Sequence, residues 1–359
     1  MNYQKRRKNL FKKMEKDGAE SFLVSNPINI FYLTGFKSSR IYLLLTKGET
    51  FLFTDFRYEE AARALCEKEG INFVLLNKKL TNLLKVIVKK FQIKKIFFEA
   101  NNLKVAEFNS LKKGVRKIKW LEAKTWIHDI RDCKDDDEIK LIKKAIRVAE
   151  NAFKSIKKSE WIGLTEIDAA DLLAERIKLE GKKIGAHAVP SFDFIVAAGK
   201  NAAVPHHSPD NTIIENNCML KIDWGAKIEN YCSDMTRTLF FGKQSKKFKE
   251  IYNIVLKANK TAIKTARSGI MLEKIDSAAR KIITAKGYGK CFRHGTGHAV
   301  GLEVHDGKGP FVGCKSRAKK GMVITIEPGI YIPGWGGIRI EDMIVITSKG
   351  AEVLTSLPK

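Results

Sequence analysis

Two periodicities of apolar and polar positions alternate up to about residue 125 of the chain. The segments AESFLVS, INFVLL and KKIFFEA are short runs rich in branched and aromatic residues and predict strands, and IYLLLTKGETFLFTD predicts a β-hairpin. Between them, RYEEAARALCEKEG, LTNLLKVIVKKF and LKVAEFNSLKKG carry apolar residues at helical spacing. This alternation predicts a small α/β domain over residues 1–130.

The pattern changes at the segment TWIHDIRDCKDDDE. Residues Asp135 to Asp137 offer an N-cap and negative charge for a first helical turn, so we expect a long helix from about Glu138. We place the domain boundary here, which makes residues 131–359 the second domain.

The second domain contains a weak internal sequence repeat. A helical stretch at 137–156 precedes GLTEIDAADLLAERIKLEG, and about a hundred residues later a stretch at 249–266 precedes GIMLEKIDSAARKIITAKGYG. Each second stretch carries an Ile-Asp pair followed by two alanines and is expected to end at glycine. The repeat indicates a duplicated domain whose halves face each other, with a site between them, although alanine-rich helices also resemble one another by chance.

Length and composition limit the class of protein. The 359 residues, 44% of them hydrophobic, are too many for one typical core and favour two domains. No run approaches the roughly 18 apolar residues of a membrane span, and the basic N-terminus has no apolar segment behind it, so we expect a surface helix there and a cytoplasmic protein. Six cysteines without a C-x-x-C pair predict reduced thiols.

The net charge of +26 raises the question of a nucleic-acid partner. The excess of lysine and arginine is spread over both domains, mostly on helix faces such as KKAIRVAENAFKSIKK, and these segments lack the interleaved aromatic residues of single-strand binders. We interpret the charge as a solvated surface and do not expect nucleic acid as a partner.

The stretch RHGTGHAVGLEVHD concentrates three of the seven histidines, His294, His298 and His305, within residues 293–306. Such histidines are either satisfied core residues or part of a metal or acid/base site. The second interpretation requires acidic partners elsewhere in the chain.

Four carboxylates in apolar, β-prone surroundings are candidates for these partners. Asp223 and Asp234 lie eleven residues apart, Glu327 is expected at the end of a strand before a Pro-Gly turn, and Glu341 in the middle of an apolar strand pattern. Each alone could be an ion-paired residue, but an unpaired buried carboxylate costs several kcal/mol. Four carboxylates with His298 suit two divalent cations that activate a water molecule, which predicts a hydrolase. No G-x-S-x-G elbow or specially placed cysteine suggests a covalent nucleophile.

The ordered set of D-x10-D, HGTGH, IEPG and RIED resembles the pita-bread metallopeptidases, and within them the proline-specific branch of aminopeptidase P and prolidase. The resemblance covers nearly the whole chain. It implies a creatinase-like N-terminal α/β domain, which includes NPINIFYLTGF, followed by a duplicated pita-bread catalytic domain. The dinuclear ligands it implies are Asp223, Asp234, His298, Glu327 and Glu341, with Asp234 and Glu341 bridging both ions.

The resemblance also implies roles around the metals. Glu327 is the general acid/base, His294 lines the proline side of the pocket, and His305 contacts the scissile amide. His206 is the substrate-side histidine of the PHHS loop, which leaves His207 as a bystander, and Arg339 precedes the bridging glutamate by two residues. Ala299 and Asp306 depart from the usual glycine and glutamate at their positions.

The implied function is hydrolysis of the bond between an N-terminal residue and proline in short peptides by a homodimer with two divalent ions, Mn²⁺ first and Co²⁺ or Zn²⁺ as alternatives. The chain's long N-terminal domain argues against methionine aminopeptidase, and its full ligand set argues against metal-free creatinase. Two alternatives stay open: a non-catalytic binding module for nucleic acid or protein, and an aminopeptidase without proline specificity.

Overall fold

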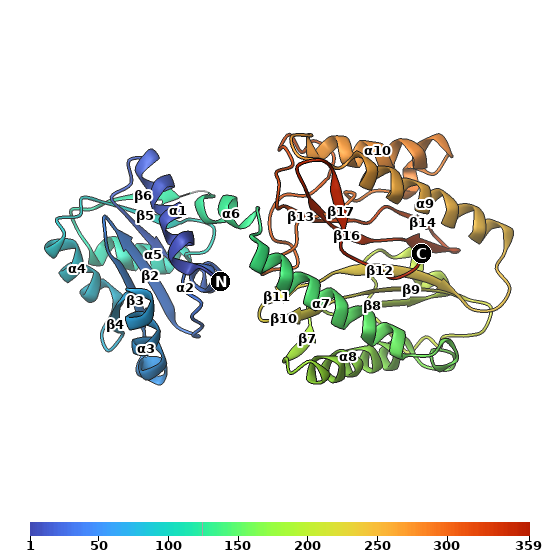
Figure 1. Ribbon diagram of the computed structural model, residues 1–359, viewed down its shortest axis with the longest axis horizontal. Coiled ribbons are helices and arrows are strands. Elements are labelled where there is room, and N and C mark those ends of the chain that lie inside the picture. Colours follow the sequence, from blue (N-terminus) through green and yellow to red (C-terminus); the bar gives the residue numbers. More distant parts are fainter. Residues whose placement is uncertain (124) are drawn as a thin grey trace. The chain divides into compact units, whose positions relative to one another are not determined.

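The computed structural model describes residues 1–123 and 125–359, which form two compact units, Met1–Ile130 and Arg131–Lys359. Both units mix helices and strands, so the predicted α/β class is confirmed (Figure 1). None of the helices in the described residues is long and apolar enough to cross a membrane. All six cysteines are free thiols.

The first unit is built on one six-stranded sheet in the order β4-β3-β2-β1-β5-β6. The predicted hairpin is the antiparallel pair β2 and β3, and the parallel pairings of β1 with β5 and β5 with β6 extend the sheet. The strands are β1 Ser21–Val24, β2 Ile41–Thr46, β3 Thr50–Thr54, β4 Asn72–Leu75, β5 Lys95–Glu99 and β6 Lys119–Ala123. The helices are α1 Tyr3–Lys16, α2 Pro27–Thr34, α3 Glu59–Glu69, α4 Leu80–Lys90, α5 Val105–Gly114 and α6 Trp126–Arg131.

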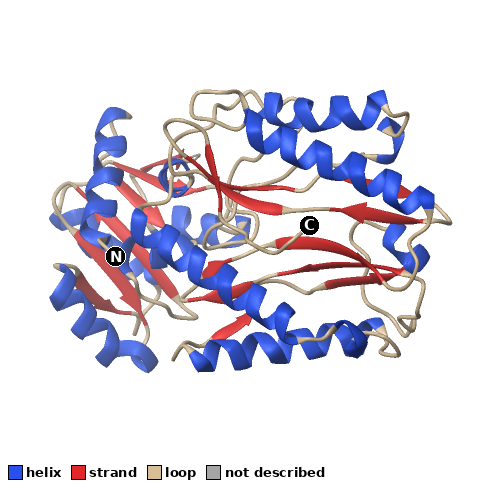
Figure 2. Ribbon diagram, turned by 45° about the vertical axis from the view of Figure 1, so that its right-hand side comes forward, coloured by secondary structure: helices blue, strands red, loops and turns tan. Residues whose placement is uncertain are grey.

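The second unit places strands between two pairs of helices. Helices α7 (Asp136–Ser155) and α8 (Glu166–Lys183) lie on one side of the strands, and α9 (Lys246–Thr265) and α10 (Leu272–Ala285) lie on the other (Figures 1 and 2). The capping box between Asp135 and Glu138 fixes the start of α7, as the run of aspartates predicts.

The strands of the second unit form short antiparallel sheets of two or three strands. The sheets are β11-β10-β7, β12-β9-β8, β13-β16-β17 and β14-β15. The strands are β7 Ala188–Pro190, β8 Ile195–Ala198, β9 Met219–Trp224, β10 Ala226–Ile228, β11 Tyr231–Cys232, β12 Met235–Phe240, β13 Val323–Ile326, β14 Gly329–Ile332, β15 Gly336–Arg339, β16 Asp342–Ile346 and β17 Ala351–Val353. Short 3₁₀ turns occur at Phe56–Tyr58, Lys158–Glu160, Gly199–Ala203 and Gly289–Cys291.

Two local predictions were wrong. Helix α8 continues past Gly181 to Lys183, because this glycine sits where the helix packs on β7: a Cβ there would lie 2.5 Å from the Ala188 side chain. Glu341 is not inside a strand. The chain leaves the β14-β15 sheet after Arg339 and joins β13 from Asp342 onward, so Glu341 lies at the switch between two sheets.

Candidate metal centre

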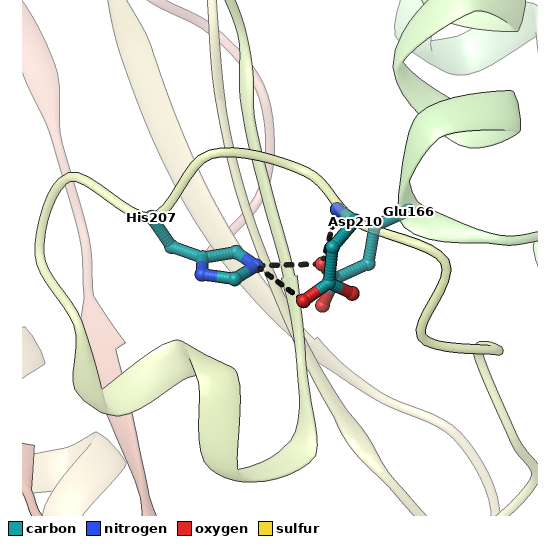
Figure 3. A group of neighbouring side chains, drawn as sticks. All are labelled: Glu166, His207 and Asp210. Carbon is teal, nitrogen blue, oxygen red and sulfur yellow. Dashed lines mark hydrogen bonds and ion pairs between the residues drawn. The ribbon is translucent and has the colours of Figure 1, made fainter.

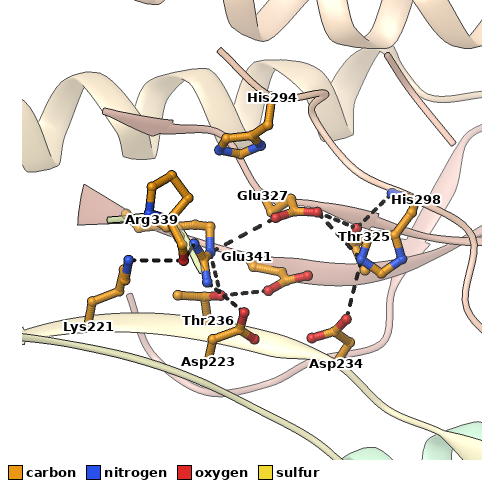
Figure 4. A network of polar contacts seen from close by, with 12 residues as sticks. Lys221, Asp223, Asp234, Thr236, His294, His298, Thr325, Glu327, Arg339 and Glu341 are labelled. Atoms are coloured by element: carbon orange, nitrogen blue, oxygen red, sulfur yellow. Dashed lines mark hydrogen bonds and ion pairs between the residues drawn. The ribbon is translucent and has the colours of Figure 1, made fainter. Parts of the chain in front are cut away.

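Four acidic side chains converge where strands of the second unit end (Figure 4). Asp223 lies near the end of β9 and Asp234 just before β12, and the antiparallel pairing of these strands brings the end of one beside the start of the other. Glu327 directly follows β13, and Glu341 lies between β15 and β16. Strand pairing and the packing of neighbouring sheets therefore bring together carboxylates that lie up to 118 positions apart in sequence, as Asp223 and Glu341 do.

The His298 imidazole faces this group. Its Nε2 atom lies 3.4 Å from Asp234 Oδ2 and 3.6 Å from Glu327 Oε1. Its Nδ1 atom lies 3.3 Å from the Ala299 carbonyl, to which it can donate, and this leaves the Nε2 lone pair directed at two carboxylates. One ligand atom each of Asp234, His298 and Glu341 lie within 4.8 Å of one another.

The buried carboxylates lie close enough to repel one another, and a bound cation would stabilise their ionised forms. Burial, followed by the neighbouring charges of Asp223 and Glu327, raises the pKa of Asp234 well above its usual range. Burial and the charge of Asp234 do the same for the pKa of Glu341. Moreover, the Oδ1 atoms of Asp223 and Asp234 are buried and have no hydrogen-bond partner in the described structure. Unpaired buried oxygens beside an available imidazole nitrogen fit divalent cations with hard ligands.

Hydrogen bonds hold the carboxylates in place. Arg339 Nη2 donates to Asp223 Oδ2 at 2.5 Å, and Arg339 Nε donates to Thr236 Oγ1 at 2.8 Å. Thr236 Oγ1 in turn donates to Glu341 Oε2 at 2.7 Å. Arg339, matched in the sequence only by its position before the glutamate, thus orients one carboxylate directly and another through a hydroxyl group.

All nine predicted site residues line one cavity of about 680 Å³ in the second unit. They are His206, Asp223, Asp234, His294, His298, His305, Glu327, Arg339 and Glu341. Apolar side chains, among them Phe192, Phe194 and Phe311, line the same cavity. A cavity of this size, in which apolar side chains accompany a set of convergent polar groups, is typical of a small-molecule or peptide site.

The two histidines that flank His298 in sequence have different surroundings. His294 Nε2 lies 3.0 Å from the Tyr331 hydroxyl and Nδ1 lies 2.7 Å from the Gly295 carbonyl, and burial lowers the pKa of His294. The His305 ring centroid lies 4.1 Å from that of His298, and burial together with His298 lowers the pKa of His305. Both imidazoles therefore favour the neutral form.

The turn that carries His305 is held by Asp306, one of the two departures from the family pattern. The buried Asp306 carboxylate lies 2.6 Å from Arg131 Nη2 and accepts the Leu302 N–H at 2.9 Å. Aspartate at this position is thus engaged with an internal arginine and a backbone amide, away from the metal ligands.

Sequence reasoning missed Lys221, which lies in β9 two residues before Asp223. The side chain is fully buried, and its Nζ donates to the carbonyls of Ala202, Val204 and Pro205 at 3.2, 2.6 and 3.2 Å. Burial and nearby Arg339 lower the pKa of Lys221 to about 6, whereas three carbonyl acceptors favour the ammonium form with its three N–H groups. A lysine inside the apolar run CMLKIDW was the available signal.

A second missed feature joins His207 to α8 (Figure 3). His207 Nε2 lies 2.6 Å from Glu166 Oε2, which also accepts the Asp210 N–H at 3.1 Å. Glu166 Oε1 accepts the Ala198 N–H at 2.7 Å and the Asn201 side-chain amide at 3.0 Å. Because each carboxylate oxygen already meets two nitrogen donors, this group is explained without a cation, as a clasp that ties the His206 loop to the start of α8.

The buried carboxylate cluster suits the binding of divalent cations, and the fold places it on one cavity. The model of the metallopeptidase family M24 matches residues 140–348, and that of the creatinase/prolidase N-terminal domain matches residues 6–133. The chain belongs to the M24 metallopeptidase family. Its prediction as an enzyme is therefore confirmed, against the alternative of a non-catalytic binding module.

Several proteins resemble the chain over nearly its whole length. An uncharacterized peptidase of Bacillus subtilis is 34% identical, and the match covers 98% of this chain and 97% of the relative. The solved structure of an Xaa-Pro dipeptidase from Bacillus anthracis is 35% identical with a TM-score of 0.94 and covers 100% and 99% of the two chains. That of an X-Pro aminopeptidase from Thermotoga maritima is 34% identical with a TM-score of 0.88 and covers 98% and 97%.

Proposed function

We propose that this metallopeptidase hydrolyses the peptide bond between an N-terminal residue and proline. The observation that carries the proposal is the convergence of four carboxylates and His298 on one peptide-sized cavity. The choice of proline is supported by the solved structures that the chain resembles, which are named as Xaa-Pro peptidases.

The cation-holding residues would be Asp223, Asp234, His298, Glu327 and Glu341. When bound, two divalent ions would polarise the scissile carbonyl and make a water molecule acidic enough to attack it near neutral pH. We propose Mn²⁺ as the native ion because carboxylate oxygens dominate the donor set, with Co²⁺ or Zn²⁺ as alternatives.

Glu327 is suited to move the proton. Its side chain is 17% exposed, compared with 13% for Asp223 and 5% for Asp234, so it has the most access to the cavity of these three carboxylates. Thr325 Oγ1 lies 3.3 Å from one of its oxygens and holds its orientation. Glu327 would accept the proton of the attacking water and deliver it to the leaving proline nitrogen.

The histidines would handle the substrate. A bond to proline has no N–H, so recognition must rest on the ring and on the carbonyl oxygen. His294, held between Tyr331 and Gly295, would line the proline side, and His305 would donate to the scissile amide oxygen. His206 would close the cavity from the loop that the Glu166 clasp and Lys221 hold.

A substrate comparison tests the proposal. The manganese-loaded enzyme should cleave Ala-Pro-Ala at its first bond at least about a hundredfold faster, in kcat/KM, than Ala-Ala-Ala, a difference of roughly 2.7 kcal/mol in transition-state binding. Equal rates would establish the alternative of an aminopeptidase without proline specificity. A homodimer and a cytoplasmic location, both expected from the sequence, stay predictions.

A further inference from the structure

The guanidinium on the wall of the metal-centre cavity already forms hydrogen bonds within the protein. Among residues 1–123 and 125–359, Arg339 is the only lysine or arginine that lines it. Its guanidinium donates to Asp223, Thr236, Tyr331 and the Pro205 carbonyl. His294 uses both ring nitrogens, with Nδ1 placed to donate to the Gly295 carbonyl and Nε2 placed to accept from the Tyr331 hydroxyl. A neutral imidazole satisfies both contacts, and burial lowers the pKa of His294, so this residue offers little positive charge to a ligand.

Two phenylalanine side chains lie close to His294 and the residue that follows it. The Phe292 ring packs edge-on against His294 with centroids 5.0 Å apart. Phe311 lies against the following residue so closely that a Cβ on Gly295 would come within 2.7 Å of the Phe311 Cβ. Phe311 is nevertheless 43% exposed and lines the cavity, and its neighbour Val312 is 63% exposed. An apolar surface therefore continues outward from the side of the cavity where His294 lies.

This arrangement bears on the length of the substrate. In an Xaa-Pro dipeptide the proline carries a free carboxylate. A carboxylate that leaves water for a wall whose guanidinium is already paired with other groups loses hydration that nothing replaces. In a longer peptide the same position is a neutral amide, and the next side chain reaches the apolar surface of Phe311 and Val312, where burial is favourable. Solved relatives carry dipeptidase or prolidase names more often than aminopeptidase names, but both kinds occur, so similarity alone does not establish the substrate length of this chain.

We propose that the chain acts on Xaa-Pro peptides of three or more residues, with an apolar residue after proline that packs on Phe311, in preference to Xaa-Pro dipeptides. The proposal rests on the proposed function, because it takes His294 as the proline side of the cavity. Phe311 would set specificity without touching the reacting atoms.

The test uses the full-length manganese enzyme and four substrates: Ala-Pro, Ala-Pro-amide, Ala-Pro-Ala and Ala-Pro-Phe. The amide removes the carboxylate charge without adding a residue, so it separates charge from length. We expect kcat/KM for Ala-Pro-amide to exceed that for Ala-Pro by about tenfold or more, and Ala-Pro-Phe to exceed Ala-Pro-Ala several-fold. Equal or better cleavage of free Ala-Pro overturns the inference and leaves an Xaa-Pro peptidase, whereas failure to cleave any of the four peptides counts against the proposed function itself.

Variants of Phe311 test the residue directly. Phe311→Lys should raise kcat/KM for Ala-Pro and lower it for Ala-Pro-Phe, and Phe311→Ala should bring Ala-Pro-Phe down to the level of Ala-Pro-Ala. Val353→Lys, which adds the same charge at an exposed position in β17, is the matched control and should change neither ratio. If His206→Ala selectively loses cleavage of Ala-Pro and still cleaves Ala-Pro-amide, then His206 binds the free carboxylate of the dipeptide, and the inference is refuted.

Discussion

Glu166→Gln should weaken both the stability of the second unit and the binding of substrate. The Glu166 side chain is fully buried, and each of its oxygens meets two nitrogen donors. Glutamine replaces one oxygen by an NH₂ group that cannot accept. In the least costly orientation this NH₂ group faces His207 and the Asp210 N–H. His207 can change tautomer and accept a hydrogen bond from it, whereas the Asp210 N–H can only donate and loses its acceptor.

The size of the effect follows from these four contacts. One backbone N–H left unpaired in the interior costs about 1–3 kcal/mol, and hydrogen bonds to a charged acceptor lose about 1 kcal/mol each when the acceptor becomes neutral. Because removal of the charge also relieves some desolvation, we expect a net loss of about 2–4 kcal/mol. For a unit of this size the melting temperature should fall by roughly 5–15 °C.

Calorimetry and steady-state kinetics together measure this prediction. The KM for Ala-Pro-Ala should rise in Glu166→Gln, because the clasp holds the loop of His206, while the bound metal content should stay at the wild-type level. Asp171→Asn, an exposed change on the same helix, is the control and should shift stability by no more than about 0.5 kcal/mol. A Glu166→Gln protein with wild-type melting temperature and KM would refute the assignment of Glu166 as a clasp.

Other perturbations have equally definite outcomes. Asp234→Asn should abolish turnover and reduce bound metal, because an amide cannot balance two cations; full occupancy with a near-normal rate, measured on one sample, would contradict the ligand assignment. His206→Ala should lower kcat/KM with little change in melting temperature, whereas His207→Ala should mainly lower the melting temperature through loss of the Glu166 contact; the reverse pattern would exchange their roles. The gain in melting temperature from Mn²⁺ over chelator-treated protein should grow from about pH 5 to pH 7. Because the pKa values of Asp234 and Glu341 are raised, the metal-free folded state keeps protons that the unfolded state has already released. The metal-free protein therefore loses stability as the pH rises toward the raised pKa values. A gain in melting temperature from Mn²⁺ that does not depend on pH would argue against this coupling.

Local patterns were enough to predict much of this protein. Strands β1 to β5 and helices α3 to α5 of the first unit follow from apolar periodicity, whereas β6, α2 and α6 were not predicted. The start of α7 follows from the Asp135 capping box, because such a cap depends on residues close in sequence. The acidic ligand candidates were visible for a related reason: Asp223 and Asp234 are conspicuous in apolar, β-prone runs, where an unpaired carboxylate is costly.

The tertiary structure decided what depends on distant partners. The place of Glu341 at a switch between two sheets follows from which strands β15 and β16 pair with, and periodicity within the segment does not contain that information. The Glu166–His207 clasp joins residues 41 positions apart, and Lys221 meets carbonyls 16 to 19 positions away. The ion pair of Arg339 with Asp223 joins residues 116 positions apart. In the part of the chain that the structure describes, it leaves no free guanidinium on the cavity wall. Hydrogen-bond partners and burial are set by long-range packing. The residue types therefore indicated which side chains could bind metal or move protons, and only the fold showed which of them already form hydrogen bonds with other parts of the chain.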